Sequence, residues 1–165
     1  MQPILISVGS NIAPVQNTQS GLDALQEIFG DIQLSPVYES ESVGFDGNNF
    51  LNLVVLAQTK MAIDEIVSAF KRIEAAHGRV RGEEKFASRT LDLDLLTFGD
   101  TICTTPIILP REEILYNAFV LRPLADLVPN WLHPIENKPY AELWQQYDSS
   151  KQRLWISDFA WSKNK

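Results

Sequence analysis

A strict alternation of leucine and aspartate near the middle of the chain most strongly constrains the fold. Leu91, Leu93 and Leu95 occupy every second position, and Asp92 and Asp94 lie between them. Because successive side chains of a β-strand point to opposite faces, this spacing predicts a strand with one apolar and one acidic face. The apolar face needs a core on one side of a sheet, so the strand must belong to a larger packed structure.

Other segments predict two helices and further strands around this one. Apolar residues at helical spacing follow Pro14, which suits a first helical turn, and stop at Gly30. A second helical pattern starts at Ile63 and stops at Gly78. The resulting order, β-α-β-β-α-β, predicts an α+β fold, a ferredoxin-like sandwich with an antiparallel sheet and helices packed on it. The strands are expected at residues 4–8, 32–38, 50–59 and 90–98.

The remaining segments predict polar loops and short helices. Residues 39–49 and 79–88 are polar and are expected to form loops, the first long enough to suggest a function. The chain contains no linker-like stretch, low-complexity tract or internal repeat. Residues 1–165 are therefore expected to form a single domain with a C-terminal extension. Short helices are expected at residues 112–116, 121–127 and 140–147.

Composition narrows the class of protein. The net charge of −7 and the pI near 4.8 argue against a nucleic-acid-binding protein, because such proteins are usually basic. Cys103 is the only cysteine, so no disulfide can form within the chain. No apolar run approaches the ~18 residues needed to cross a bilayer. We therefore expect a cytoplasmic monomer that acts on small molecules and binds neither membranes nor nucleic acids.

Positive charge is concentrated directly before the leucine–aspartate segment. Six of the 14 lysine and arginine residues fall between positions 71 and 89. In an acidic protein, such a segment could bind a small polyanion. The alternative is that these side chains only solvate a helix end and a loop. The six residues are Lys71, Arg72, Arg79, Arg81, Lys85 and Arg89.

The two aspartates are suited to bind a divalent cation. At a rise of about 3.3 Å per residue, Asp92 and Asp94 lie about 7 Å apart, too far for a hydrogen-bonded carboxyl pair. Two carboxylates on one face repel each other, and a cation removes that repulsion. Oxygen ligands favour Mg²⁺, which commonly lies between carboxylates and phosphates. The alternative is an edge strand with a hydrated face. The neighbouring basic segment favours phosphoryl-transfer chemistry.

Four motifs, in this order along the chain, point to one protein family. They are Ser7-Val8-Gly9-Ser10-Asn11, Phe50-Leu51-Asn52, Gly78-Arg79-Val80-Arg81 leading to Arg89-Thr90-Leu91-Asp92-Leu93-Asp94, and Asn117-Ala118-Phe119-Val120-Leu121. With these motifs the sequence resembles the 6-hydroxymethyl-7,8-dihydropterin pyrophosphokinases of folate biosynthesis. The resemblance implies a Mg-dependent transferase that moves the diphosphate of ATP, its co-substrate, onto the pterin and releases AMP.

The resemblance also implies roles for charged residues. Asp92 and Asp94 would hold two Mg²⁺ ions, and Glu74 would be a supporting polar residue on the nucleotide side. Four basic residues would contact phosphates or close a loop over them, and Phe86 matches an aromatic position of that loop. These basic residues are Arg79, Arg81, Lys85 and Arg89.

A second set of residues would form the pterin pocket. By resemblance, Phe50 and Phe119 would sandwich the pterin ring, Asn52 would hydrogen-bond its amide edge, and Val43 would line the pocket. From the residues alone, each phenylalanine could equally belong to the core. Phe50 and Asn52 are two positions apart and should share a strand face, where a ring and an amide could hold a flat polar heterocycle.

The chain departs from the usual pattern of the family at several positions. Arg111 stands where histidine is usual, and Asn117 stands where arginine is usual. We hypothesise that the positive charge has moved, so that Arg111 contacts ATP in place of the missing arginine. The alternative is an exposed Arg111 paired with Glu112 or Glu113. Other departures are Ser40-Glu41, Ala87-Ser88, Pro106 and Ile108.

Two other functions remain open at this point. A ferredoxin-like RNA-binding module has the same strand order, although the acidic charge and the lack of a basic aromatic strand oppose it. A pterin-binding paralogue, with another pterin substrate or weak catalysis, would carry the same motifs. The two histidines, His77 and His133, are expected to be surface or capping residues, so no general base is predicted.

Overall fold

The computed structural model describes residues 1–41, 49–78, 90–150 and 152–162. Its elements follow the predicted order β-α-β-β-α-β, except that the second predicted strand is divided in two, and short helices with one more strand come after them. They are β1 (Gln2–Ser10), α1 (Pro14–Phe29), β2 (Gln33–Leu34), β3 (Tyr38–Ser40), β4 (Phe50–Thr59), α2 (Ile63–Ala76), β5 (Asp92–Phe98), the 3₁₀-helix η1 (Glu112–Leu115), α3 (Ala118–Leu127), α4 (Tyr140–Gln146) and β6 (Leu154–Ile156).

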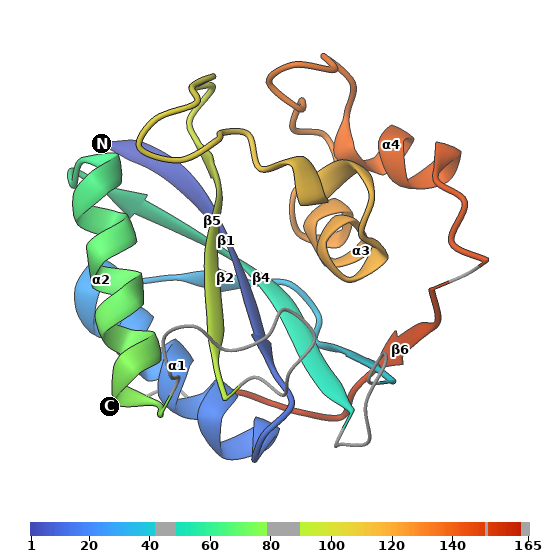
Figure 1. The fold of residues 1–165 in the computed structure, drawn as a ribbon. Helices are drawn as coiled ribbons and strands as arrows, with labels where there is room; N and C mark the ends of the chain where they lie inside the picture. Colours follow the sequence, from blue (N-terminus) through green and yellow to red (C-terminus); the bar gives the residue numbers. More distant parts are fainter. Residues whose placement is uncertain (42–48, 79–89, 151, 163–165) are drawn as a thin grey trace.

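The strands form one sheet in the order β5-β1-β4-β3-β6, and β2 also pairs with β4. All of these pairings are antiparallel. Helices α1 and α2 lie on one side of the sheet, and α3 and α4 lie on the other (Figure 1). This arrangement confirms the predicted ferredoxin-like α+β sandwich.

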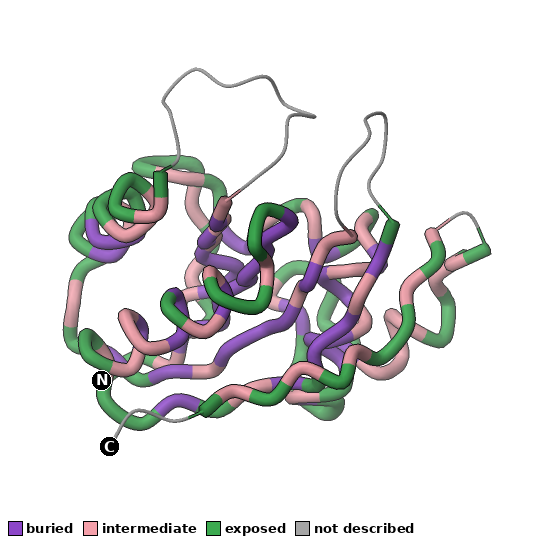
Figure 2. The backbone as a smooth tube through the Cα atoms, turned by 90° about the horizontal axis from the view of Figure 1, so that it is seen from below, coloured by how far each residue is buried: buried purple, intermediate pink, exposed green. Residues whose placement is uncertain are grey.

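Alternate residues of β1 contribute to two separate hydrophobic cores, one on each face of the sheet. Ile4, Ile6 and Val8 are fully buried in the core beneath α1 and α2, together with alternate residues of β4 and β5. Leu5, on the opposite face, joins a second core formed with α3 and α4. Figure 2 shows the buried residues concentrated along the strands. The second core stops short of Ser7 and Gly9, so one end of that face stays available for polar side chains.

The two long helices begin and end as predicted. Pro14 occupies the first turn of α1, where its missing N–H costs no hydrogen bond. Gly30 follows α1 with a φ of 78°, a conformation that favours glycine. The N–H of Ala62 donates to the side chain of Glu65 at 2.9 Å at the start of α2. Gly78, with a φ of 83°, follows the end of α2.

The predicted strand at residues 32–38 is wrong in one respect, because the structure divides it into β2 and β3. Pro36 has no N–H for a sheet ladder, and the hydroxyl of Ser35 accepts the N–H of Val54 at 2.9 Å. The predicted loop at 39–49 begins later than expected, since Glu39 and Ser40 lie in β3. Helix α3 begins three residues earlier than predicted, because Asn117 caps it.

The segment after β5 folds back beside that strand. Cys103 and Leu109 form an antiparallel bridge, and the N–H of Arg111 then donates to the carbonyl of Leu96 at 2.8 Å. This contact places Arg111 next to the strand that carries the two aspartates. Among the described residues, none of the helices has the length and apolar content to cross a membrane.

Candidate active site

The two aspartates lie on the face of β5 that shares a side with α3. Asp92 is opposite Gly9 of β1, and Asp94 is opposite Ser7. Both aspartates are half-buried, whereas Leu93, which lies between them and points to the other face, is only 4% exposed. The predicted separation into an acidic and an apolar face is therefore confirmed.

Asn52 lies in the same row as Asp92. Gly9 of β1 is opposite Asp92 on one side and opposite Asn52 of β4 on the other. Directly opposite residues of antiparallel strands share a face, so the carboxylate and the amide flank Gly9 across two strand spacings, about 10 Å. A β-carbon on Gly9 would lie 2.8 Å from Oδ1 of Asn52. The missing side chain therefore leaves room for the amide.

The donor set on this face of β5 fits the Mg²⁺ ions that the resemblance implies. Asp92 and Asp94 offer hard carboxylate oxygens, which suit this cation. Among the described residues, no group of three or more histidine, cysteine, aspartate or glutamate side chains could hold a metal ion. Beside a nucleotide, Mg²⁺ commonly keeps several waters and binds phosphate oxygens in addition to one or two carboxylates.

Glu74 supports the strand between the two aspartates. Its Oε2 accepts the backbone N–H of Leu93 at 2.9 Å. Strand β5 is at the end of the described sheet, so this N–H lies on the side away from β1. The sequence predicted a supporting polar role for Glu74 on the nucleotide side. The structure adds a direct contact with the strand that carries the predicted metal ligands.

Arg111 contacts one of the predicted metal ligands. Its Nη2 lies 3.4 Å from Oδ1 of Asp94, and its Nε donates to Oε1 of Glu113 at 3.0 Å. Burial lowers the pKa of Arg111, but the negative charges of Asp94 and Glu113 outweigh it and raise the net pKa above its usual value. Pairing with Glu113 was one of the two predicted alternatives. The contact with Asp94 was not predicted.

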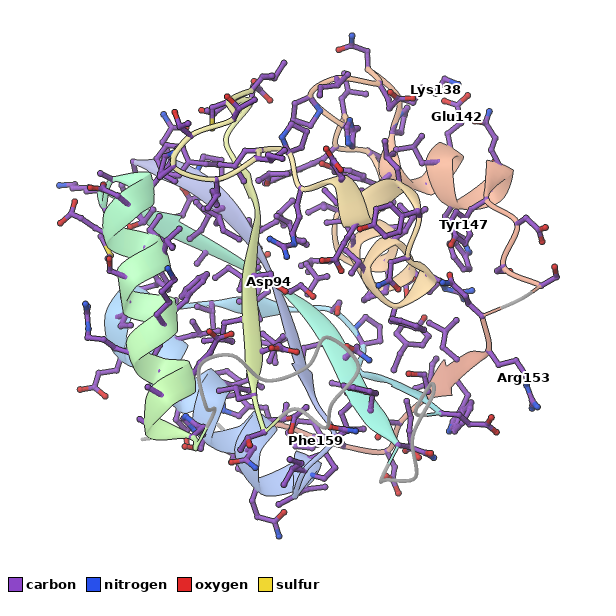
Figure 3. The ribbon with its side chains drawn as sticks, viewed as in Figure 1. Asp94, Lys138, Glu142, Tyr147, Arg153 and Phe159 are labelled. Carbon is purple, nitrogen blue, oxygen red and sulfur yellow. The ribbon has the colours of Figure 1, made fainter. Side chains whose placement is uncertain are left out.

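Glu113 extends this contact to the start of α3. Its Oε2 accepts from Nδ2 of Asn117 at 3.5 Å, and Oδ1 of Asn117 accepts the N–H of Phe119 at 3.1 Å. Asn117 therefore caps α3, a role that asparagine performs well. Sequence reasoning named Glu113 as a partner of Arg111 but missed its contact with Asn117, although the spacing of four residues between them was a usable signal. Figure 3 marks Asp94 in the central part of the molecule.

Both predicted pterin-stacking residues are half-buried. Phe50 begins β4, two residues before Asn52, and Phe119 lies in the first turn of α3. Neither belongs to the two cores that the described residues form. Helix α3 packs against β4, which brings the elements that carry the two rings together.

Several predicted site residues lie outside the described residues. Val43 belongs to the segment 42–48, and the basic loop belongs to the segment 79–89. Their predicted roles stay predictions. The loop residues concerned are Arg79, Arg81, Lys85, Phe86 and Arg89.

The two histidines act as caps, as the sequence predicted. Nδ1 of His77 lies 2.7 Å from the carbonyl of Ile73 at the end of α2. Nδ1 of His133 accepts the backbone N–H groups of Ile135 and Glu136. His133 is only 2% exposed, so it is a capping residue and not a surface residue.

The family whose sequence pattern matches the chain is described as 7,8-dihydro-6-hydroxymethylpterin-pyrophosphokinase (HPPK), and the match covers residues 5–129. The chain belongs to this family. Membership in the HPPK family decides between the enzyme and the RNA-binding alternative in favour of the enzyme.

Two bacterial HPPK relatives illustrate the similarity. The 2-amino-4-hydroxy-6-hydroxymethyldihydropteridine pyrophosphokinase of Pseudomonas aeruginosa is 36% identical over 135 residues, which are 79% of this chain and 83% of that protein. The protein of the same name from Aquifex aeolicus is 30% identical over 145 residues, which are 86% of this chain and 90% of that protein.

Solved HPPK structures share the fold. The HPPK-DHPS S436F/A437G/A613S triple mutant of Plasmodium falciparum superimposes with a TM-score of 0.73 at 14% identity, covering 90% of this chain. The wild-type protein gives a TM-score of 0.71, also at 14% identity. This chain spans less than half of those longer chains, 42% and 45% respectively. At such low identity the likeness concerns the fold alone.

Proposed function

We propose that the chain transfers the diphosphate of ATP to the hydroxymethyl group of 6-hydroxymethyl-7,8-dihydropterin and releases AMP. The observation that carries this proposal is the shared row of Asp92 and Asn52 on either side of Gly9. In that row, a predicted metal ligand and a predicted pterin-binding amide occupy one face of the sheet. The two strands that carry these groups are about 10 Å apart, so the carboxylate and the amide can contact different parts of one bound substrate pair.

Each side chain has one task in this proposal. Asn52 hydrogen-bonds the amide edge of the pterin, while Phe50 and Phe119 hold its ring. Bound to Asp92 and Asp94, Mg²⁺ would neutralise charge on the transferred phosphates. Glu74 keeps β5 in place through its contact with the strand backbone. The chain contributes mainly by positioning and by charge, as is general in phosphoryl transfer.

The reaction is the displacement of AMP from the β-phosphorus. The hydroxymethyl oxygen forms a bond to this phosphorus and its proton passes to water, while the bond from the phosphorus to the oxygen bridging to the α-phosphorus breaks and AMP leaves with that oxygen. We assign neither histidine as a general base, because His77 and His133 are engaged with backbone groups through Nδ1. We propose that the enzyme does this in the cytoplasm, as a monomeric single domain.

An assay of AMP release tests the proposal. The purified chain is mixed with ATP, the pterin and Mg²⁺, and each component is omitted in turn. AMP formation that requires all three supports the proposed reaction. Pterin binding measured by calorimetry, without AMP formation, would instead identify the chain as a pterin-binding paralogue. Light scattering on a sizing column checks the proposed monomer.

A further inference from the structure

The guanidinium of Arg111 lies beside an oxygen that the proposed metal site would use. Its Nη2 is 3.4 Å from Oδ1 of Asp94, while its Nε is hydrogen-bonded to Glu113. The side chains of Arg111 and Asp94 are 33% and 35% exposed, so water and ions can reach the pair.

The fold holds Arg111 in this position. Its backbone N–H donates to the carbonyl of Leu96, two residues after Asp94 on the same strand. The Arg111 side chain therefore starts next to the acidic face of β5, and only the guanidinium needs to move for the contact with Asp94 to break.

We propose that Arg111 competes with a divalent cation for Asp94 until the phosphates of a nucleotide draw the guanidinium away. This inference rests on the proposed function. Its consequence is that the metal binds Asp94 together with the nucleotide and only weakly by itself.

Three physical facts support the exchange. A guanidinium and a divalent cation repel each other, so the two do not favourably share one carboxylate oxygen. A half-exposed ion pair is weak enough to break without a large cost. A triphosphate offers Arg111 a stronger partner, because the planar guanidinium can bind two phosphate oxygens at once.

The coupling works in both directions. If the nucleotide strengthens metal binding, the metal strengthens nucleotide binding by the same factor. If Arg111 competes with the metal only when no nucleotide is bound, its replacement should affect the metal affinity of the free protein and that of the nucleotide complex differently. It should strengthen binding of the metal alone, and it should not strengthen binding in the presence of the nucleotide.

Manganese is a suitable probe, because it prefers the same oxygen ligands as Mg²⁺ and its free form is measured by electron paramagnetic resonance. Its affinity is measured for the native chain, Arg111→Gln, Arg111→Lys and Arg153→Gln. Each protein is titrated alone and with a saturating ATP analogue whose α,β-bridge is a methylene group. Arg153 is exposed and lies at the periphery, away from Asp94 (Figure 3), so its replacement controls for the loss of one positive charge.

We expect Arg111→Gln to bind Mn²⁺ alone roughly tenfold more tightly than the native chain, because a nearby positive charge is removed. With the analogue, this advantage should disappear or reverse. Arg111→Lys should stay closer to the native chain than Arg111→Gln, and Arg153→Gln should change neither affinity by more than about twofold.

Equal Mn²⁺ affinity of the native chain and Arg111→Gln in the absence of nucleotide would overturn the inference. An equal gain in Mn²⁺ affinity for Arg153→Gln would also overturn it, because the gain would then come from the change in net charge and not from the position of Arg111. These outcomes differ from failure of the proposed function, which would show itself as a lack of Mn²⁺ binding to the native chain even with the analogue.

Discussion

Gly9 and Asn52 are so close that a β-carbon on Gly9 would lie 2.8 Å from Oδ1 of the amide. That oxygen is at the end of a side chain that can rotate, so we expect Gly9→Ala to fold normally and to displace the amide. Affinity for the pterin should fall by roughly tenfold, the scale of one lost hydrogen bond to a buried polar group. Calorimetry in the presence of a non-reacting ATP analogue measures the pterin affinity of Gly9→Ala and of the native chain.

A double-mutant cycle shows whether the effect of Gly9→Ala acts through the amide. In the background of Asn52→Ala, the same substitution should cause little further loss of pterin affinity. Additive losses would mean that Gly9 affects the pocket in another way.

Asp92→Asn and Asp94→Asn should each reduce the rate of AMP formation by about a thousandfold. Loss of a metal ligand should remove roughly 4 kcal/mol of transition-state stabilisation. Turnover is measured at saturating Mg²⁺, and thermal unfolding checks that the fold survives. Asp100→Asn serves as a matched control, because Asp100 is exposed beyond the end of β5. Retention of more than a tenth of native activity would refute the assignment of either ligand.

Glu74→Ala should loosen β5. The lost hydrogen bond to the N–H of Leu93 should lower the free energy of unfolding by about 1–2 kcal/mol. Glu74→Gln keeps an acceptor oxygen and should retain most of this stability. Hydrogen exchange at the amide of Leu93, which should accelerate in Glu74→Ala, separates this role from a direct contact with nucleotide. Unchanged exchange at this amide would show that the bond does not hold the strand.

Phe50→Ala should weaken pterin binding more than ATP binding. A stacked ring contributes about 1–3 kcal/mol on the scale seen for bases on aromatic side chains. Calorimetry with each ligand gives the two affinities. Tyr116→Ala, at an exposed aromatic position, is the control and should leave pterin affinity unchanged. If Phe50→Ala retains native pterin affinity, the ring belongs to the packing of β4 instead.

His133 should make stability depend on pH. Burial lowers the pKa of His133 below its usual 6.5, with a smaller opposing effect from Glu136. A depressed folded-state pKa means that its contribution is present above the unfolded pKa and is lost as the pH falls through the folded value. From pH 7.5 to 5, the native chain should therefore lose more unfolding free energy than His133→Asn, measured by urea unfolding. Parallel pH curves would contradict this.

Local patterns predicted the three long strands of the sheet and the position of the two aspartates, whereas the predicted strand at residues 32–38 proved to be two short ones. The alternation from Leu91 to Leu95 predicted the two faces of β5, because a strand has a period of two whatever surrounds it. The ends of α1 followed from Pro14 and Gly30, whose backbone preferences act locally. These predictions are confirmed because they depend on neighbours in the chain.

Contacts between distant segments could not be predicted in the same way. The contact between Arg111 and Asp94 depends on how the segment 99–111 folds back, and no periodicity describes that path. The bond from Glu74 to the N–H of Leu93 requires the exact placement of α2 beside β5. Strand β6 was missed because its three residues, Leu154–Ile156, are too few to show a pattern.

The hydrogen bond from the N–H of Leu93 to Glu74 also bears on the association of one molecule with another through the edge of the sheet. Strand β5 is at the end of the described sheet order, and an unpaired strand edge can template pairing with another chain. Glu74 occupies one donor of that edge with a charged side chain. We therefore expect Glu74→Ala, which frees this N–H, to aggregate more readily during concentration and storage than Glu74→Gln, which keeps an acceptor for it.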